Sequence, residues 1–168
     1  MSNKINRSRK ISNYSLKKAS EHVLYEVWMF FQTLELLLHN PNQLEINILL
    51  DAFAIHTRNL FDFLYPKRNY KKDDIIIYDY IINRKNYERN KTLKVDLKFI
   101  VRKADKQVAH LTYSRNKYNT KTKPWAFLEI GRKMHLTLSA FCKSLDKRQQ
   151  QISNFLKLKS ILDKYQNL

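Results

Sequence analysis

One histidine lies in a run of cations after residue 100. Arg102, Lys103, Lys106 and His110 fall within nine consecutive residues. On a helix, Lys103, Lys106 and His110 share one flank, away from the apolar stripe. Near a helix C-terminus the macrodipole favours a protonated imidazole. This grouping suits the binding of a phosphate, with His110 as an acid or base. The alternative is a surface histidine on a generic basic face.

A second polar cluster interrupts an apolar segment between residues 41 and 65. Arg58 and Asp62 are four residues apart, so they can pair across one helical turn. His56 and Asn59 share a face of the same helix. These groups either orient a site shared with His110 or form a buried hydrogen-bonded network that fixes helix packing. The packing interpretation is favoured for His56 and Asn59, and Arg58 is left open.

Several common chemistries have no matching residues. The sequence has no HExxH motif, no Gly-rich phosphate loop and no nucleophile elbow. No two histidines have the four-residue spacing that metals use on helices. The histidines are His22, His39, His56, His110 and His135. Cys142 is the only cysteine, which excludes an intramolecular disulfide and a Cys-based zinc site. We therefore expect no metal and no cofactor.

Hydrophobic periodicity predicts four long helices. They span residues 20–39, about 40–65, about 92–113 and 124 to about 145. Ser20 is the expected N-cap of the first helix. Asn40 is the expected N-cap of the second helix, and Pro41 takes the first helical position. The second helix is apolar around most of its circumference, which is typical of a central helix. Gly131 lies on the apolar stripe of the fourth helix and predicts a close helix crossing.

Four other segments have weaker patterns. Residues 66–74 (PKRNYKKDD) form a basic loop. The run IIIYDYII at residues 75–82 is either a short strand or a short helix capped by Asp73. Residues 83–91 have the composition of a solvated connection. The tail is either a fifth helix docked on the bundle or a helix exchanged with a partner.

The expected fold is thus all-α, a single four- to five-helix bundle. Its expected parts are a basic flexible arm (1–19), the bundle (20–145) and a C-terminal helix or tail (146–168).

The charge balance is strongly basic. Lys and Arg number 32 against 15 Asp and Glu, a formal net charge of +17. Such a charge attracts polyanions, whether RNA, DNA, an acidic membrane or an acidic protein. An AT-rich genome, whose codons favour Lys, Asn, Ile and Tyr, would explain the same composition. The sequence shows no secretory signal and no apolar run of about 18 residues. We expect a cytoplasmic protein without membrane attachment.

Two patterns together resemble a known family. These are AIHTRNLFDFLYP at residues 54–66 and KADKQVAHLTYSR at residues 103–115. They resemble the HEPN-like all-α proteins, and most of all the branch linked with abortive infection and toxin–antitoxin modules. The resemblance covers roughly residues 20–145. It implies a four- or five-helix bundle and, in many members, a metal-independent endoribonuclease whose site forms across a dimer.

The same resemblance implies roles for particular residues. RNA would supply its 2′-hydroxyl as the nucleophile, and His110 would act as general base or acid. Arg102, Lys103 or Lys106 would stabilise charge on the phosphate. Seven residues separate Arg102 from His110 and six separate Lys103 from it, whereas the family has an arginine four to six residues before the histidine. Substrate-binding residues would be Lys106, Arg58 and Arg115, supported by His56, Asn59 and Asp62.

The implied partners are RNA, a second copy of the chain, and a cognate antitoxin or nucleotidyltransferase-like protein. The alternative function is a non-catalytic module that binds nucleic acid or a partner protein through its basic face. It predicts strongly salt-dependent binding and no turnover.

Overall fold

The computed structural model describes residues 11–39, 41–67, 69–91, 94–104, 113, 116 and 125–168. Seven α-helices and the 3₁₀ turn η1 have their bounds in these residues. They are α1 (Asn13–Leu38), α2 (Gln43–Leu64), η1 (Ile77–Asp79), α3 (Arg84–Asn90), α4 (Lys94–Ala104), α5 (Phe127–Ser144), α6 (Lys147–Gln150) and α7 (Ser153–Lys164). The all-α class is confirmed. The helix count exceeds four to five because two short helices, α3 and α6, form in the segments expected to connect or trail the bundle.

Helix α1 begins at Asn13, and the prediction of an N-cap at Ser20 is wrong. The cap is Ser12, whose hydroxyl oxygen accepts a hydrogen bond from the Ser15 backbone N–H at 3.1 Å. The helix extends this far back because Leu16 is buried and continues the apolar stripe. Ser20 is instead a fully buried residue inside the helix. Residues 13–19, expected to belong to the arm, are therefore helical.

Helix α2 begins at Gln43, not at Pro41. Its N-cap is Asn42, whose side chain accepts hydrogen bonds from the backbone N–H groups of Leu44 and Glu45. The Glu45 carboxylate accepts the Asn42 N–H in return, at 2.8 Å, which completes a capping box. The observed cap, Asn42, lies two residues after the predicted cap, Asn40. The predicted end near Tyr65, before Pro66, is confirmed.

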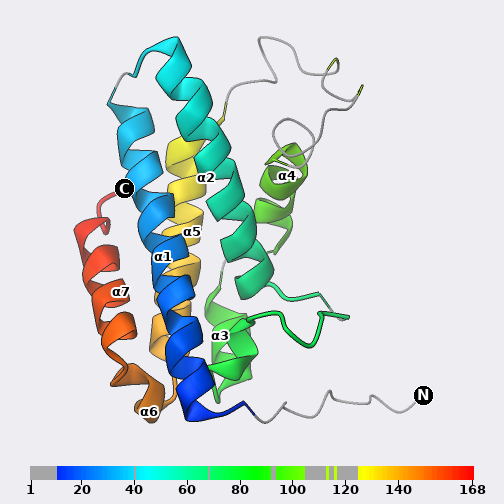
Figure 1. The fold of residues 1–168 in the computed structure, drawn as a ribbon, viewed down its shortest axis with the longest axis vertical. Helices are drawn as coiled ribbons and strands as arrows, with labels where there is room; N and C mark the ends of the chain where they lie inside the picture. The colour runs from blue at the N-terminus through cyan, green and yellow to red at the C-terminus, as the bar shows by residue number, and fades with distance from the viewer. Residues whose placement is uncertain are drawn as a thin grey trace.

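One core rich in aromatic side chains lies between helices α1, α2, α5 and α7. In Figure 1, α1 and α2 form the near layer, α5 lies behind them and α7 lies beside α1. Helix α1 contacts α2, α5 and α7. The Phe30 and Phe53 rings stack at 5.1 Å between α1 and α2, and Phe31 stacks on Tyr165 at 4.6 Å. The first half of α2 is not central, because Leu44 and Ile48 are mostly exposed.

Gly131 marks the predicted close crossing between α5 and α1. A Cβ atom on Gly131 would lie 2.6 Å from Cδ2 of Leu34, a fully buried side chain of α1. Real Cβ atoms do not approach another carbon this closely, so only glycine fits without a shift of Leu34. The prediction from the apolar stripe is confirmed.

The IIIYDYII run at residues 75–82 forms neither the short strand nor the short helix capped by Asp73 that were expected. A 3₁₀ turn, η1, occupies its centre, and Ile81 forms an isolated antiparallel bridge with Leu145. Residues 83–91 are not a solvated connection but hold helix α3. The reason is one side chain, Tyr87, which is fully buried and donates its hydroxyl to the Leu64 carbonyl oxygen at 2.9 Å.

The third predicted helix is described as α4, where Leu97 and Ile100 are buried. Its predicted continuation through residues 105–112 lies outside the described residues, as does Pro124. The fourth predicted helix is α5, beginning at Phe127. The apolar stripe predicts a buried Leu128, but Leu128 is exposed, and Ile130 is buried in its place.

The C-terminal tail is docked on its own chain. Phe155 of α7 is fully buried and makes edge contacts with Tyr80 and Phe141 at 5.2 and 5.5 Å. At the other end of α7, the Lys164 ammonium lies 2.8 Å from the Glu35 carboxylate, and the Tyr165 hydroxyl also bonds this carboxylate. The hydrogen bonds from Lys164 and Tyr165 lower the pKa of Glu35. The tail is therefore part of the bundle.

Candidate functional site

The C-terminal end of α4 holds the two predicted catalytic cations that the structure describes. Arg102 is exposed. Lys103 is half-buried, with its ammonium 5.1 Å from the centre of the Trp125 ring. Burial lowers the pKa of Lys103. Trp125 in turn meets Phe53 of α2 edge-on at 6.3 Å. Lys103 thus lies against an aromatic cluster between α4 and α2, where a cation–π contact holds it.

The structure does not describe the other residues that were predicted to act with Arg102 and Lys103. His110, Lys106 and Arg115 lie outside the described residues. Their roles as acid/base and substrate-binding groups stay predictions. Arg58, the remaining predicted substrate-binding residue, is half-buried on α2.

His56 makes a contact that the sequence did not reveal. It is buried, and its Nδ1 lies 2.7 Å from Oε2 of Glu26 on α1. The Tyr25 ring packs edge-on against the imidazole at 5.8 Å. This is the hydrogen-bonded packing network favoured for His56, because it joins the two central helices. Glu26 carries no sequence signal for this role, since the pairing spans 30 residues.

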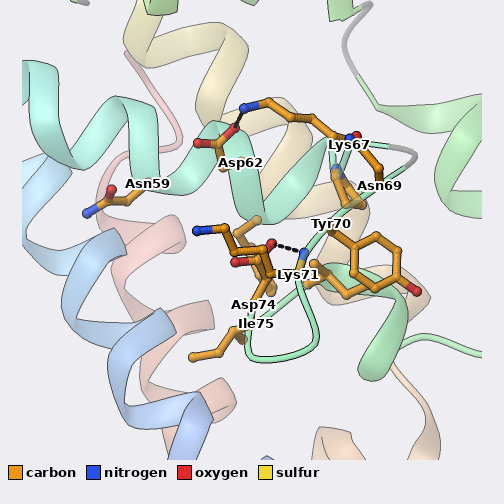
Figure 2. A pocket seen from close by; sticks show the side chains of 11 residues that line it. Asn59, Asp62, Lys67, Asn69, Tyr70, Lys71, Asp74 and Ile75 are labelled. Atoms are coloured by element: carbon orange, nitrogen blue, oxygen red, sulfur yellow. Dashed lines mark hydrogen bonds and ion pairs between the residues drawn. The ribbon is translucent and has the colours of Figure 1, made fainter. Parts of the chain in front are cut away.

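Asn59 and Asp62, by contrast, face solvent-accessible space. They line a hollow of about 370 Å³ where the end of α2 meets the loop that follows it. Figure 2 shows Lys67 reaching over Asp62 and Asn59 lying at the other side. The Lys67 ammonium is 3.8 Å from the Asp62 carboxylate, and Asp74 accepts the Lys71 backbone N–H at 2.7 Å. The first contact joins the start of the loop to α2, and the second lies within the loop.

The polar groups of this hollow are mixed in kind. They come from Asn59, Asp62, Lys67, Asn69, Tyr70, Lys71 and Asp74. Ammonium groups can contact a phosphate, while amide and carboxylate oxygens can accept hydrogen bonds from sugar hydroxyls or base amines. The sequence predicted only a basic loop for residues 66–74. The density of Lys, Asn and Asp there was the available signal for this site.

A smaller hollow of about 190 Å³ adjoins the first. It shares Asn59, Phe63 and Ile75 with it and adds His22 and Glu26 from α1. The two hollows thus lie side by side, and only the smaller one is lined by residues of α1. Asn59 lies at their junction and is exposed. Its predicted role as a buried packing residue beside His56 is therefore wrong.

The contact between Lys103 and Trp125 and the hollow beside Asn59 lie at different positions along α2. Lys103 and Trp125 pack beside Phe53, nine residues before Asp62. At 1.5 Å per residue this is a rise of about 13 Å. Nine residues also turn the helix by about half a circle, so the two places lie on different sides of α2.

Other reactive groups in the described part of the chain offer little chemistry. Cys142 is buried, and burial raises the pKa of its thiol to about 12, which keeps it protonated at neutral pH. Among the described residues, no three His, Cys, Asp or Glu side chains gather as a metal site would require. No helix in this part of the chain combines the length and apolarity needed to span a bilayer.

Comparison with known proteins finds no matching family model, no similar curated protein and no similar solved structure.

Proposed function

We propose that this chain is an RNA-directed protein that binds the RNA backbone through basic side chains at the end of α2 and of α4. The observation that carries the proposal is the charge. Even if each of the 15 carboxylates neutralised one cation, 17 Lys and Arg would remain. RNA is the polyanion that also uses the mixed amide, carboxylate and ammonium groups of the hollow beside Asn59 and Lys71.

The proposal includes cleavage. In the HEPN-like interpretation, His110 acts as general base or acid on a 2′-hydroxyl, without a metal. Arg102 is exposed at the end of α4, which supports a role for it in contacting a phosphate. A second copy of the chain would complete such a site, with a cognate antitoxin or nucleotidyltransferase-like protein as a further partner.

A second candidate function is binding without turnover. The position of Lys103 favours it, because this side chain is half-buried and its ammonium lies over the Trp125 ring. A cation held in that contact is less available to a catalytic His110 than the exposed Arg102 is. Such a module would bind nucleic acid or a partner protein through its basic face.

Binding is tested first. We expect labelled single-stranded RNA to bind with a strong inverse dependence on salt. The variant Lys67→Ala/Lys71→Ala should weaken binding and reduce the salt slope by about 1 for each phosphate that is no longer neutralised. Lys147→Ala/Lys157→Ala, which removes two exposed lysines on α6 and α7, is the matched control. Equal reductions in affinity for the two variants would mean that the hollow is not the RNA site.

Cleavage is tested separately with total RNA and tRNA in EDTA, comparing the parent chain with His110→Ala. Cleavage by the parent alone, leaving 2′,3′-cyclic phosphate ends, supports the ribonuclease. Undiminished cleavage by His110→Ala would contradict the assigned role. Binding without cleavage by either protein would support the second candidate.

A further inference from the structure

The basic charge of this protein is unevenly distributed. Residues 19–57 contain no Lys or Arg, although the whole chain has 32 of them. The same stretch has five carboxylates, namely Glu21, Glu26, Glu35, Glu45 and Asp51. It covers most of α1 and the first two-thirds of α2. Over residues 13–64, three cations and six carboxylates give a net charge of −3. One layer of a strongly basic protein is therefore acidic.

This acidic layer also carries exposed apolar side chains. On α1, Tyr25, Trp28 and Leu36 are about half exposed. On α2, Leu44 is 68% exposed, Ile48 61% and Ile55 50%. The α2 residues, with Asp51, recur at intervals of four, three and four, so they lie on one face of the helix. Figure 1 shows that α1 and α2 form the near layer, which α5 and α7 leave uncovered.

A groove deepens this face where α1 turns into α2. Its volume is about 370 Å³, and its lining residues are Leu36, His39, Pro41, Glu45, Ile48 and Leu49. Four of these side chains are apolar, and one is a carboxylate at the groove edge. Such an apolar surface on a single chain commonly marks a place where another protein binds.

The charges at this face select the kind of partner. Glu21, Glu45 and Asp51 are exposed beside the apolar residues. They would repel RNA and an anionic membrane, and a second copy of the same face would bring like charges together. A partner with Lys or Arg around an apolar stripe would match both the charge and the apolar surface.

We propose that the outer face of α1 and α2 binds an amphipathic helix of a partner protein, with its apolar stripe in the α1–α2 groove and flanking Lys or Arg beside Glu21, Glu45 and Asp51. The four-three-four spacing on α2 is the spacing by which one helix packs along another. This surface is distinct from the RNA-binding groups proposed at the end of α2 and α4. The inference does not depend on the proposed RNA function.

The test uses the full-length chain and a synthetic helical peptide of about three heptads with Leu at a and d and Lys elsewhere. Trp28 is 47% exposed, whereas Trp125 is buried, so a change in tryptophan emission reports mainly on this face. We expect a blue shift on binding. A scrambled Leu/Lys peptide and the same peptide with Glu for Lys should bind at least tenfold more weakly.

Variants separate this face from the rest of the surface. Leu44→Ser/Ile48→Ser and Asp51→Lys should each weaken binding of the Lys peptide at least tenfold, and circular dichroism should show an intact fold. Leu136→Ser/Leu156→Ser, with side chains 59% and 54% exposed on α5 and α7, is the matched control and should bind as the parent does.

Three results would overturn the proposal. The first is equal binding of the scrambled peptide. The second is a blue shift of Trp28 with RNA or anionic vesicles, which would assign the face to a polyanion. The third is a dimer that Leu44→Ser/Ile48→Ser dissociates, which would assign the face to a second copy.

Discussion

Gly131 shows how one missing side chain sets the distance between two helices. Helix α5 can approach α1 because Gly131 leaves room for the Leu34 side chain, which is fully buried. An alanine there would favour the helix by about 1 kcal/mol but place its Cβ 2.6 Å from Leu34 Cδ2. Overpacking of a rigid core costs about 1–3 kcal/mol.

We expect Gly131→Ala to lower the free energy of unfolding by roughly 1 kcal/mol, because the overpacking cost exceeds the gain in helix propensity. The measurement is urea unfolding followed by circular dichroism. In a Leu34→Ala background the same substitution should be neutral or stabilising, because the clashing methyl is absent. A cost of equal size in both backgrounds would show that the crossing is not the cause.

The contact between His56 and Glu26 is also a residue-scale feature. It joins α1 to α2 through a buried ring nitrogen and a half-buried carboxylate at 2.7 Å. We expect Glu26→Ala and His56→Ala each to destabilise the fold by about 1–2 kcal/mol, because each leaves a polar partner unsatisfied. A double-mutant cycle by thermal unfolding measures the coupling. RNA binding corrected for folded fraction should be unchanged, and a specific reduction would instead indicate a site role for His56.

Among the helices, α7 contributes buried side chains to the core. Its neighbouring residues Phe155 and Leu156 have opposite environments, the first fully buried and the second exposed. We expect Phe155→Ala to lower stability by about 3–5 kcal/mol, because it removes ring contacts to Tyr80 and Phe141. Leu156→Ala should change it by less than about 0.5 kcal/mol. Similar small effects at both positions would mean that α7 is not docked in solution.

At the scale of the whole molecule, the dominant feature is a net charge of +17 on 168 residues. Self-repulsion of like charges destabilises the compact state, and salt screens it. We expect the melting temperature to rise by a few degrees as monovalent salt is raised from low to moderate concentration. Differential scanning fluorimetry measures this rise. A melting temperature that falls with salt would show that attractive ion pairs outweigh the repulsion.

The sequence alone determined those features that depend on local periodicity or composition. The all-α class, the end of α2 before Pro66, the stripe of α5 and the tight crossing at Gly131 follow from apolar spacing and from Pro and Gly chemistry. The predicted starts of α1 and α2 are wrong because several Ser and Asn residues stand near each start. Only the backbone geometry selects which of them accepts the capping hydrogen bonds.

The tertiary structure decided everything that requires two distant segments to meet. The 3₁₀ turn and α3 exist because Tyr80, Ile81 and Tyr87 find partners in α1, α2 and Leu145. The partner of His56, the hollow beside Asn59 and the uncovered apolar face of α2 likewise do not follow from spacing. Helical periodicity shows which side of a helix is apolar, but only the packed neighbours determine whether that side is buried. For this reason Leu44 and Ile48, on a helix predicted to be central, are exposed.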